Sequence, residues 1–238
     1  NYGKDRLIEA AKIAEMYSNL RVLAANVLDE TGKQVFQPYQ LYSYDGFVVG
    51  VIGASTPDTA TKTHPKNIQG LSFMSDEVVY GAQALVDEVD KRSDYVIVLA
   101  HLGLDEDGSV GITSKMIAEN IDGIDLIVDG HSHTVLENGM KVEDTWIVSA
   151  GEYMKYVGVV ELKVEDKKVT NVYPFLVSAA EVKDSSTSEL AKFVGITEVE
   201  PDAEVQAYID AQKKELAKIT EQVVAYTPVR LEGERADV

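Results

Sequence analysis

The sequence predicts an α/β fold with a central parallel sheet. Two apolar, β-branched runs at 94–100 and 123–128 are separated by a helical pattern, which is the order expected of parallel strands joined by a crossover helix. Another helical pattern precedes the first run, and short strand-like runs follow the second, between 145 and 177. These observations indicate layers of helix and sheet built around the two central strands.

The composition supports a folded core and excludes several classes of site. The chain has 238 residues, of which 45% are hydrophobic, so it can bury a substantial core. Its 40 acidic and 22 basic residues give a net charge of −18, which repels a nucleic acid duplex, although a bound divalent cation can still bring in a single nucleotide. The lack of cysteine excludes disulfides and thiolate metal sites. Nothing resembles a signal peptide or a membrane span.

The N-terminal part is expected to form a helix and then a strand. Apolar residues recur at helical intervals over 5–20, with charged residues between them. The run 21–27 predicts a strand. Asn26, near the end of that run, either directs its amide toward a cleft or ties down a turn, and the turn is the more common role.

A β-hairpin and a loop are predicted next. The runs 34–44 and 47–54 are rich in β-branched and aromatic residues and are separated by Asp-Gly, a strong hairpin signal. Residues 55–70 show no periodicity and predict a long loop, in which His64 is expected to be solvated, although a ligand role stays open.

The two central strands are each preceded by a predicted helix. The helix over 75–92 leads into the strand 94–100, and a helix over 113–120 leads into the second strand. The acidic residues at 105–107 either ligate a cation or form a solvated turn, and we favour the turn.

The C-terminal third is predicted to turn from strands to a helix. The runs 145–150, 158–164 and 169–177 are expected to be meander strands that close a sheet. Residues 178–188 predict a connector, and the apolar stripe over 201–225 predicts a long helix that packs on another part of the protein.

Three of the four histidines directly follow the two central strands. His101 ends the first strand, and His131 and His133 lie just beyond the second. Side chains two residues apart share a face in extended chain, and the carboxyl ends of parallel strands meet at one edge of the sheet, where open α/β folds keep their sites. We therefore expect the three imidazoles to form part of a metal centre.

The neighbouring residues leave alternatives open. The alternative for His131 and His133 is a pair of hydrogen-bonded turn residues, but the glycines beside the imidazoles clear space that a packed core would have filled. Asp129 is either an orienter of an imidazole or an ordinary strand-end carboxylate. The segment Gly151-Glu152-Tyr153 follows a predicted strand and lies either near the site or in a structural turn with a partly buried tyrosine.

Two motifs resemble a known family. Ala-His-Leu-Gly at 100–103 and Asp-Gly-His-Ser-His-Thr at 129–134 resemble the last two signature blocks of the calcineurin-like metallophosphoesterases. Further phrases resemble the 5′-nucleotidase branch of that family, in the same order along the chain, at 1–3, 52–57, 70–73 and 231–235. The resemblance implies a layered α/β/β/α metallophosphoesterase domain, incomplete here, followed by an interdomain linker helix.

The resemblance also implies a two-metal site. It assigns His101 and His131 to one divalent ion and His133 to the other, with Zn, Mn, Fe or Co as the metal. The family's Asp-x-His block, its Gly-Asp block with the bridging carboxylate and its catalytic Asn-His block all correspond to positions before residue 1. We therefore expect no catalytic residue in this chain and a partial or empty metal site, and the sequence identifies no substrate-binding residue.

The expected domain organisation follows from the same resemblance. Residues 1–183 correspond to the C-terminal part of a catalytic domain, 184–228 to a connector and the linker helix, and 229–238 to the start of a nucleotide-binding domain. The expected partners are that domain, the N-terminal segment of the same protein and a nucleotide or other phosphoester substrate, with no nucleic acid duplex and no membrane span.

The sequence therefore predicts a fragment of an extracellular, cell-wall or periplasmic enzyme of nucleotide catabolism. The parent protein is expected to hydrolyse nucleoside 5′-phosphates or 2′,3′-cyclic nucleotides, and this chain alone is expected to be inactive. The alternative is a non-catalytic scaffold or binding domain with a structural or adventitious metal ion.

Overall fold

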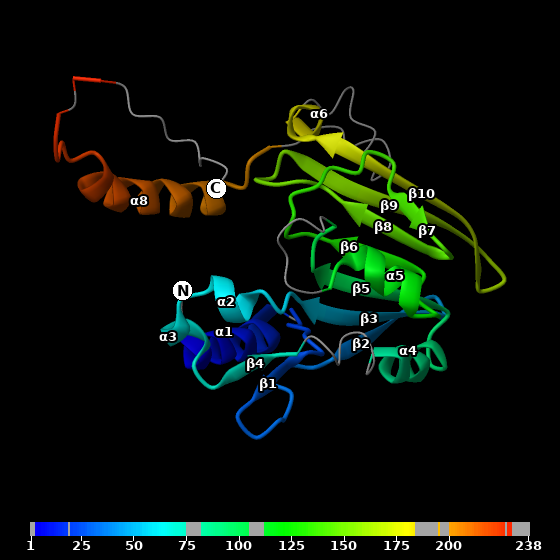
Figure 1. The fold of residues 1–238 in the computed structure, drawn as a ribbon. Coiled ribbons are helices and arrows are strands. Elements are labelled where there is room, and N and C mark those ends of the chain that lie inside the picture. The colour runs from blue at the N-terminus through cyan, green and yellow to red at the C-terminus, as the bar shows by residue number, and fades with distance from the viewer. Residues whose placement is uncertain are drawn as a thin grey trace.

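The computed structural model shows a layered α/β molecule (Figure 1). It describes residues 3–18, 20–74, 82–104, 112–183, 195, 200–226 and 228–229. The acidic residues at 105–107 lie outside this set, as do the first part of the helix predicted over 75–92 and most of 229–238.

A six-stranded sheet forms the centre of the molecule, in the order β2-β3-β5-β6-β8-β7. The inner strands are parallel, and the two edge strands are antiparallel to their neighbours. The strand bounds are Tyr39–Tyr44 (β2), Phe47–Ser55 (β3), Tyr95–His101 (β5), Leu126–Asp129 (β6), Met140–Val142 (β7) and Thr145–Ser149 (β8). The predicted parallel pair of histidine-bearing strands is confirmed as β5 and β6. The expectation that 145–150 is a meander strand is wrong, because β8 joins the central sheet parallel to β6.

The predicted hairpin is confirmed. β2 and β3 pair so that Tyr44 lies opposite Phe47. The two residues between them, Asp45 and Gly46, have φ of 50° and 85°. Two successive positive φ values are what a two-residue hairpin turn needs to match the twist of its strands, which is why Asp-Gly predicts it well.

Two helices cover one face of the central sheet. These are α4 (Ala82–Asp90), which precedes β5, and α5 (Ser114–Asn120), which precedes β6. The Thr113 hydroxyl caps α5 by accepting a hydrogen bond from the amide of Met116 at 3.2 Å. The core between helices and sheet consists of aliphatic side chains, among them Val86, Val89, Val96, Val98, Ile117, Ile127 and Ile147.

A second sheet lies over the other face. The strands β9 (Tyr156–Glu165) and β10 (Lys168–Ser178) pair only with each other, followed by α6 (Ala179–Lys183). A cavity of about 180 Å³ separates this hairpin from the ends of β6 and β8. The layers confirm the α/β/β arrangement, but β9 and β10 do not close the central sheet as predicted. Leu99 and Val128 on the central strands stay 46% and 38% exposed.

The N-terminal region differs from the prediction in two places. The helix α1 (Gly3–Ser18) is confirmed, but 21–27 makes only an isolated bridge at Leu23, and the short strand β1 (Val27–Asp29) pairs with β4 (Leu71–Phe73). The predicted loop contains two helical turns, α2 (Thr59–Lys62) and α3 (Pro65–Ile68). Single turns of helix are too short to show a period of 3.6 residues, so the sequence pattern did not reveal them.

The C-terminal helix α8 (Ala203–Thr220) lies apart from the sheets (Figure 1). Asp202 caps it by accepting hydrogen bonds from the amides of Glu204 and Val205 at 3.0 and 2.9 Å. No side chain of α8 is buried, so the predicted packing of its apolar stripe is not seen within the described residues.

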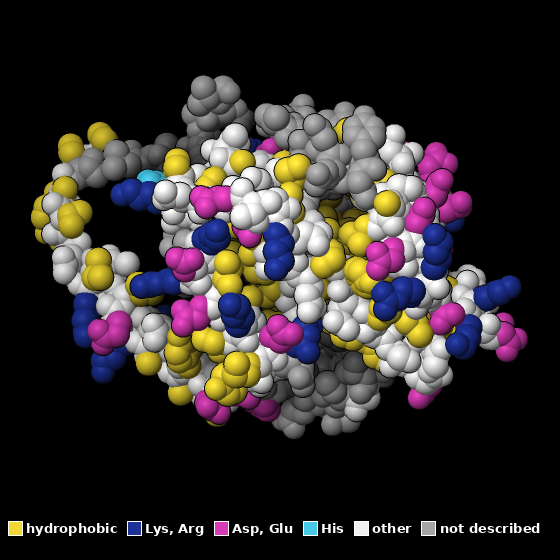
Figure 2. Space-filling model, turned by 90° about the horizontal axis from the view of Figure 1, so that it is seen from below, with side chains coloured by type: hydrophobic (Ala, Val, Ile, Leu, Met, Phe, Trp, Pro, Cys, Tyr) yellow, Lys and Arg dark blue, Asp and Glu magenta, His cyan; other side chains and the backbone are white. Residues whose placement is uncertain are grey.

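Among the described residues no helix is long and apolar enough to cross a membrane. Figure 2 shows hydrophobic side chains in the middle of one face, with charges of both signs around them.

Gly53 is a point at which the fold tolerates no side chain. A Cβ on this residue of β3 would lie 2.2 Å from the carbonyl oxygen of Leu23, and the rigid backbone there cannot give way. We expect Gly53→Ala to lower the free energy of unfolding by about 1–3 kcal/mol, the cost typical of overpacking. Urea unfolding measures this. Gly158→Ala in β9 is the matched control, because its Cβ would meet nothing closer than 3.5 Å. Equal midpoints for the two variants would contradict the close approach.

Candidate metal centre

The register of the parallel strands brings three strand ends to one edge of the sheet. Ser55, the last residue of β3, lies opposite His101, the last residue of β5. In the same sheet Leu99 of β5 lies opposite Val128 of β6, one residue before that strand ends at Asp129. Side chains that follow any of these strands can therefore meet at this edge.

His101 and His131 meet there, as predicted. Their ring centroids are 5.0 Å apart, with an angle of 63° between the ring planes. Two glycines make this possible. A Cβ at Gly130 would lie 3.2 Å from Nδ1 of His101, and a Cβ at Gly103, where φ is +86°, would lie 3.4 Å from Cδ2 of His131. The space that the sequence analysis attributed to these glycines is thus occupied by the imidazoles themselves.

His133 is held in a different direction. Both His131 and His133 have left-handed backbone, with φ of 82° and 57°, so the expectation that they share a face of extended chain is wrong. The turn sends His133 toward Glu152, and its Nδ1 lies 2.9 Å from Oε2 of that residue. The His133 side chain is 59% exposed. His133 is one of the smaller causes that lower the pKa of His101, which places the third imidazole in the same region of the surface.

Glu152 therefore lies near the site, which was one of the two alternatives for it. Its other oxygen, Oε1, accepts a hydrogen bond from Nζ of Lys155 at 2.8 Å. These contacts hold the pKa of Glu152 below its usual range, chiefly through the hydrogen bond from Lys155. The carboxylate thus stays charged and orients the imidazole of His133.

Asp129 anchors the backbone that carries His101. Its Oδ1 accepts hydrogen bonds from the amides of Leu102 and Gly103 at 3.1 and 3.2 Å, and the residue is only 9% exposed. The carboxylate at the end of β6 is thereby tied to the chain that leaves β5. Of the two alternatives for Asp129, these contacts support a strand-end carboxylate. It binds backbone amides directly after His101.

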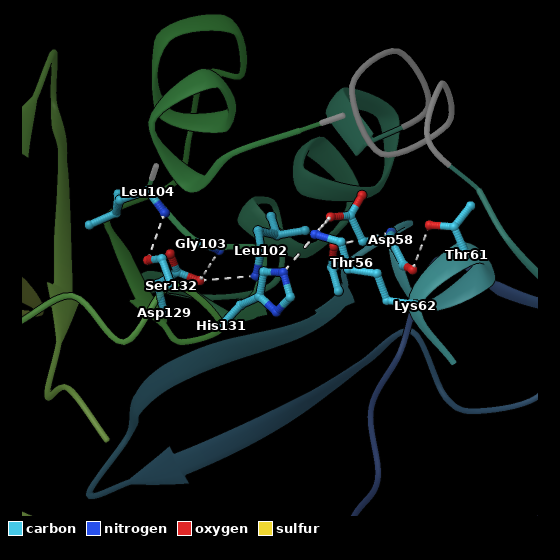
Figure 3. A network of polar contacts seen from close by, with 10 residues as sticks. All are labelled: Thr56, Asp58, Thr61, Lys62, Leu102, Gly103, Leu104, Asp129, His131 and Ser132. Atoms are coloured by element: carbon cyan, nitrogen blue, oxygen red, sulfur yellow. Dashed lines mark hydrogen bonds and ion pairs between the residues drawn. The ribbon is translucent and has the colours of Figure 1, made fainter. Parts of the chain in front are cut away.

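The hydroxyl of Ser132 adds a second tie between the two segments. It accepts a hydrogen bond from the amide of Leu104 at 3.1 Å and shares another with Thr134 Oγ1 at 2.8 Å. Figure 3 shows the contact between Ser132 and Leu104 on one side of His131, with Asp58 on the other side. The position of His131 is thus set from its own loop and from the chain after β5.

Two other residues from the sequence analysis have structural roles. The amide side chain of Asn26 donates to Ser55 O at 2.7 Å and accepts from Ser55 N at 2.9 Å, so it joins two segments that are distant in sequence and does not hold the local turn that was expected. His64 caps α3 by accepting a hydrogen bond from the amide of Lys66 at 3.2 Å. Neither belongs to the cluster of imidazoles.

Sequence reasoning missed Asp58. It lies just beyond β3, is 3% exposed, and places Oδ2 at 4.0 Å from Nε2 of His131. The signal that would have found it is its place after the carboxyl end of a parallel strand. We assigned that strand to a hairpin only and did not place it beside β5.

Burial lowers the pKa of His101. Removal from solvent is the larger cause, the neighbouring His131 adds to it, and Asp129 opposes it. His101 is therefore held in the neutral form, which is the form that binds a metal ion.

The donors fit a divalent cation in kind but fall short in number. Imidazole nitrogens and carboxylate oxygens suit first-row divalent metals. Oδ2 of Asp129 is buried and accepts no hydrogen bond within the described residues. Over the same part of the chain no three histidine or acidic side chains are grouped closely enough to hold an ion. Further donors are needed to complete a two-metal site.

Removing the Asp129 carboxylate should loosen the His101 segment. Asp129→Ala leaves two buried amides without an acceptor, so we expect the free energy of unfolding to fall by about 1–3 kcal/mol. Denaturant unfolding checks this. Asp144→Ala is the control, since that side chain is exposed and its loss should change stability by less than about 0.5 kcal/mol. Similar midpoints for both variants would show that Asp129 is not an anchor.

The lowered pKa of His101 predicts a pH dependence. The unfolded chain binds a proton at His101 near the ordinary value of 6.5, whereas the folded chain binds it only at lower pH. Stability is therefore present above about pH 6.5 and is lost as the pH falls toward the folded value. We expect His101→Gln to flatten the fall in thermal midpoint between about pH 7 and 5. A wild-type slope in His101→Gln would contradict the assignment.

Comparison with known proteins identifies relatives of this chain. No protein-family model matches it. The trifunctional nucleotide phosphoesterase YfkN of Bacillus subtilis is 30% identical over 206 residues, which cover 84% of this chain and 12% of YfkN. The 5′-nucleotidase of Vibrio cholerae is 24% identical over an alignment of 261 positions, which covers 99% of this chain and 47% of that protein. The chain thus spans less than half the length of these curated relatives.

Solved structures share the fold. The sulfate thiohydrolase SoxB of Thermus thermophilus superposes with a TM-score of 0.69 and 26% identity, over 94% of this chain and 36% of SoxB. A crystal structure of YfkN, titled a calcineurin-like phosphoesterase, superposes with a TM-score of 0.69 and 21% identity, over 93% of this chain and 69% of that structure. Together with the two histidine motifs at the sheet edge, these matches show that the chain belongs to the 5′-nucleotidase branch of the calcineurin-like metallophosphoesterases.

Proposed function

We propose that this chain is part of a metal-dependent hydrolase of nucleotide phosphoesters, acting on nucleoside 5′-phosphates or 2′,3′-cyclic nucleotides. The observation that carries the proposal is the 5.0 Å separation of the His101 and His131 rings at the ends of neighbouring parallel strands. The names of the relatives support it, since one is a nucleotide phosphoesterase and another a 5′-nucleotidase.

We assign His101, His131 and His133 as metal ligands. The family implies divalent ions, and we propose two, taken from Zn, Mn, Fe or Co. When bound, such a pair of ions supplies an activated water and stabilises charge on the phosphoryl oxygens. The chain's own residues hold the ligands in place: Asp129 fixes the segment after His101, and Glu152 orients His133.

The remaining ligands and the catalytic Asn-His block are proposed to come from other parts of a longer protein. The chain spans less than half of its curated relatives, and Leu99 and Val128 leave the central strands open to further packing. We propose that 1–183 belongs to the catalytic domain, 184–228 to a connector and linker helix, and 229–238 to the start of a nucleotide-binding domain.

We also propose that the enzyme acts in nucleotide catabolism at the cell surface, in the cell wall, in the periplasm or outside the cell. This rests on the resemblance of the sequence phrases to the 5′-nucleotidase branch.

A non-catalytic scaffold is the second candidate. It is favoured by the lack, among the described residues, of any three side chains grouped to hold a metal ion. In that case the imidazoles would bind only a structural or adventitious ion. The two candidates differ in whether the longer protein turns over substrate and whether turnover needs the three histidines.

Phosphate release from AMP with added Mn²⁺ or Zn²⁺ tests the proposal. The longer protein that contains this chain should release phosphate, and a chelator should abolish the release. His131→Ala should lower kcat/KM by more than about 100-fold, because loss of a ligand costs at least as much as loss of a residue that supports one.

The same assay contains its controls. His64→Ala should keep full activity, because His64 caps a helix outside the cluster. The 238-residue chain by itself should release no phosphate. Turnover by the chain alone would show that no essential group is missing, and undiminished activity of His131→Ala would favour the scaffold.

A further inference from the structure

Asp58 is a buried carboxylate beside one of the proposed metal ligands. It follows β3 in the segment that leads to α2, and only 3% of its surface is exposed. Its Oδ2 lies 2.9 Å from Nζ of Lys62 and 4.0 Å from Nε2 of His131 (Figure 3). A charge held out of water is costly unless it is paired, so these two contacts must account for its position.

The carboxylate does not serve the helix that it precedes. Asp58 is the N-cap residue of α2, a place where aspartate usually accepts a hydrogen bond from a free amide, but its side chain makes no capping bond. The helical turn is held by the backbone instead, since Asp58 O accepts from the amides of Thr61 and Lys62 at 3.0 and 2.8 Å. The side chain is therefore directed away from its most common local role.

Lys62 alone does not explain the burial of Asp58. Its side chain is 57% exposed, and a flexible ammonium in water contributes little to an ion pair. Oδ2 of Asp58, although buried, accepts no hydrogen bond of regular geometry in the part of the chain that is described. The oxygen thus has unused acceptor capacity, and the nearest imidazole is that of His131.

We infer that Asp58 is a positioning residue for His131. Its carboxylate accepts a hydrogen bond from Nε2–H, which leaves Nδ1 unprotonated and available to a cation. The 4.0 Å separation exceeds a hydrogen bond by about 1 Å, a gap that a small side-chain rotation closes. Histidines that bind metals commonly donate their other ring N–H to a carboxylate or carbonyl, which fixes the tautomer and the ring orientation. The inference rests on the proposed metal-binding role of His131.

The role predicts a spectroscopic signature that needs no metal. In the metal-free 238-residue chain, two-bond ¹H–¹⁵N spectra should show His131 protonated at Nε2, with that proton protected from exchange with water. Asp58→Ala should abolish the protection, and Asp58→Asn, which keeps an acceptor oxygen, should restore part of it. His131→Ala assigns the signal.

Lys62→Ala is the matched control. It removes the ion pair of Asp58 but leaves the carboxylate beside His131, so the protected Nε2–H should remain. In a Zn²⁺ titration by calorimetry, Asp58→Ala should bind about 10- to 100-fold more weakly than wild type, whereas Lys62→Ala should stay within about twofold. A purely structural role, exerted through α2, would make the two variants alike.

The outcomes separate this inference from the proposed function. An unchanged Nε2–H signal in Asp58→Ala, or the same loss in Lys62→Ala, would overturn the positioning role. A signal that depends on Asp58 in a chain that binds no Zn²⁺ would uphold the contact between Asp58 and His131. Whether His131 binds a metal ion in the longer protein is decided separately, by the chelator and the His131→Ala variant in the phosphate-release assay.

Discussion

Hydrogen bonding between the parallel strands β3, β5 and β6 is the constraint on which the rest of the site depends. Because these strands run in register, three separate chain segments leave the sheet at the same edge, each with a polar residue at the strand end or just beyond it: Asp58, His101 and His131. None of these residues is close to another in sequence. The pairing of the strands brings them together, and the aliphatic core packs the sheet against α4 and α5.

The site is then refined by contacts between side chains and backbone. Asn26 ties the end of β3 to the segment before β1, and Asp129 ties the end of β6 to the chain after β5. Each is a buried polar side chain that satisfies backbone groups which the sheet leaves free. Glycine at 103 and 130 completes the arrangement, since a Cβ at Gly130 would press on the His101 ring and Gly103 has a positive φ of 86° beside the His131 ring.

Sequence patterns predict the parts of this structure that depend on hydrophobic periodicity and on turn residues. The strand that ends at His101, the strand that ends before His131, the helix that precedes each of them and the Asp-Gly turn all follow from local rules. The direction of the His133 side chain does not follow from local rules, because its left-handed backbone depends on contacts made only after folding, such as the contact with Glu152. Asp58 was missed for a related reason: a carboxylate after a strand gains meaning only when the neighbour of that strand is known.

The helix α8 has a consequence for the motion of the C-terminal region. It has 18 residues, which gives it a length of about 27 Å, and no side chain along it is buried. A solvated helix of this length is only marginally stable in water by itself, and among the described residues Asp202 supplies a cap but no side chain supplies a core. Its amides should therefore exchange with deuterium much sooner than those of β5, and the rigidity of α8 depends on whatever packs against Tyr208 and Leu216.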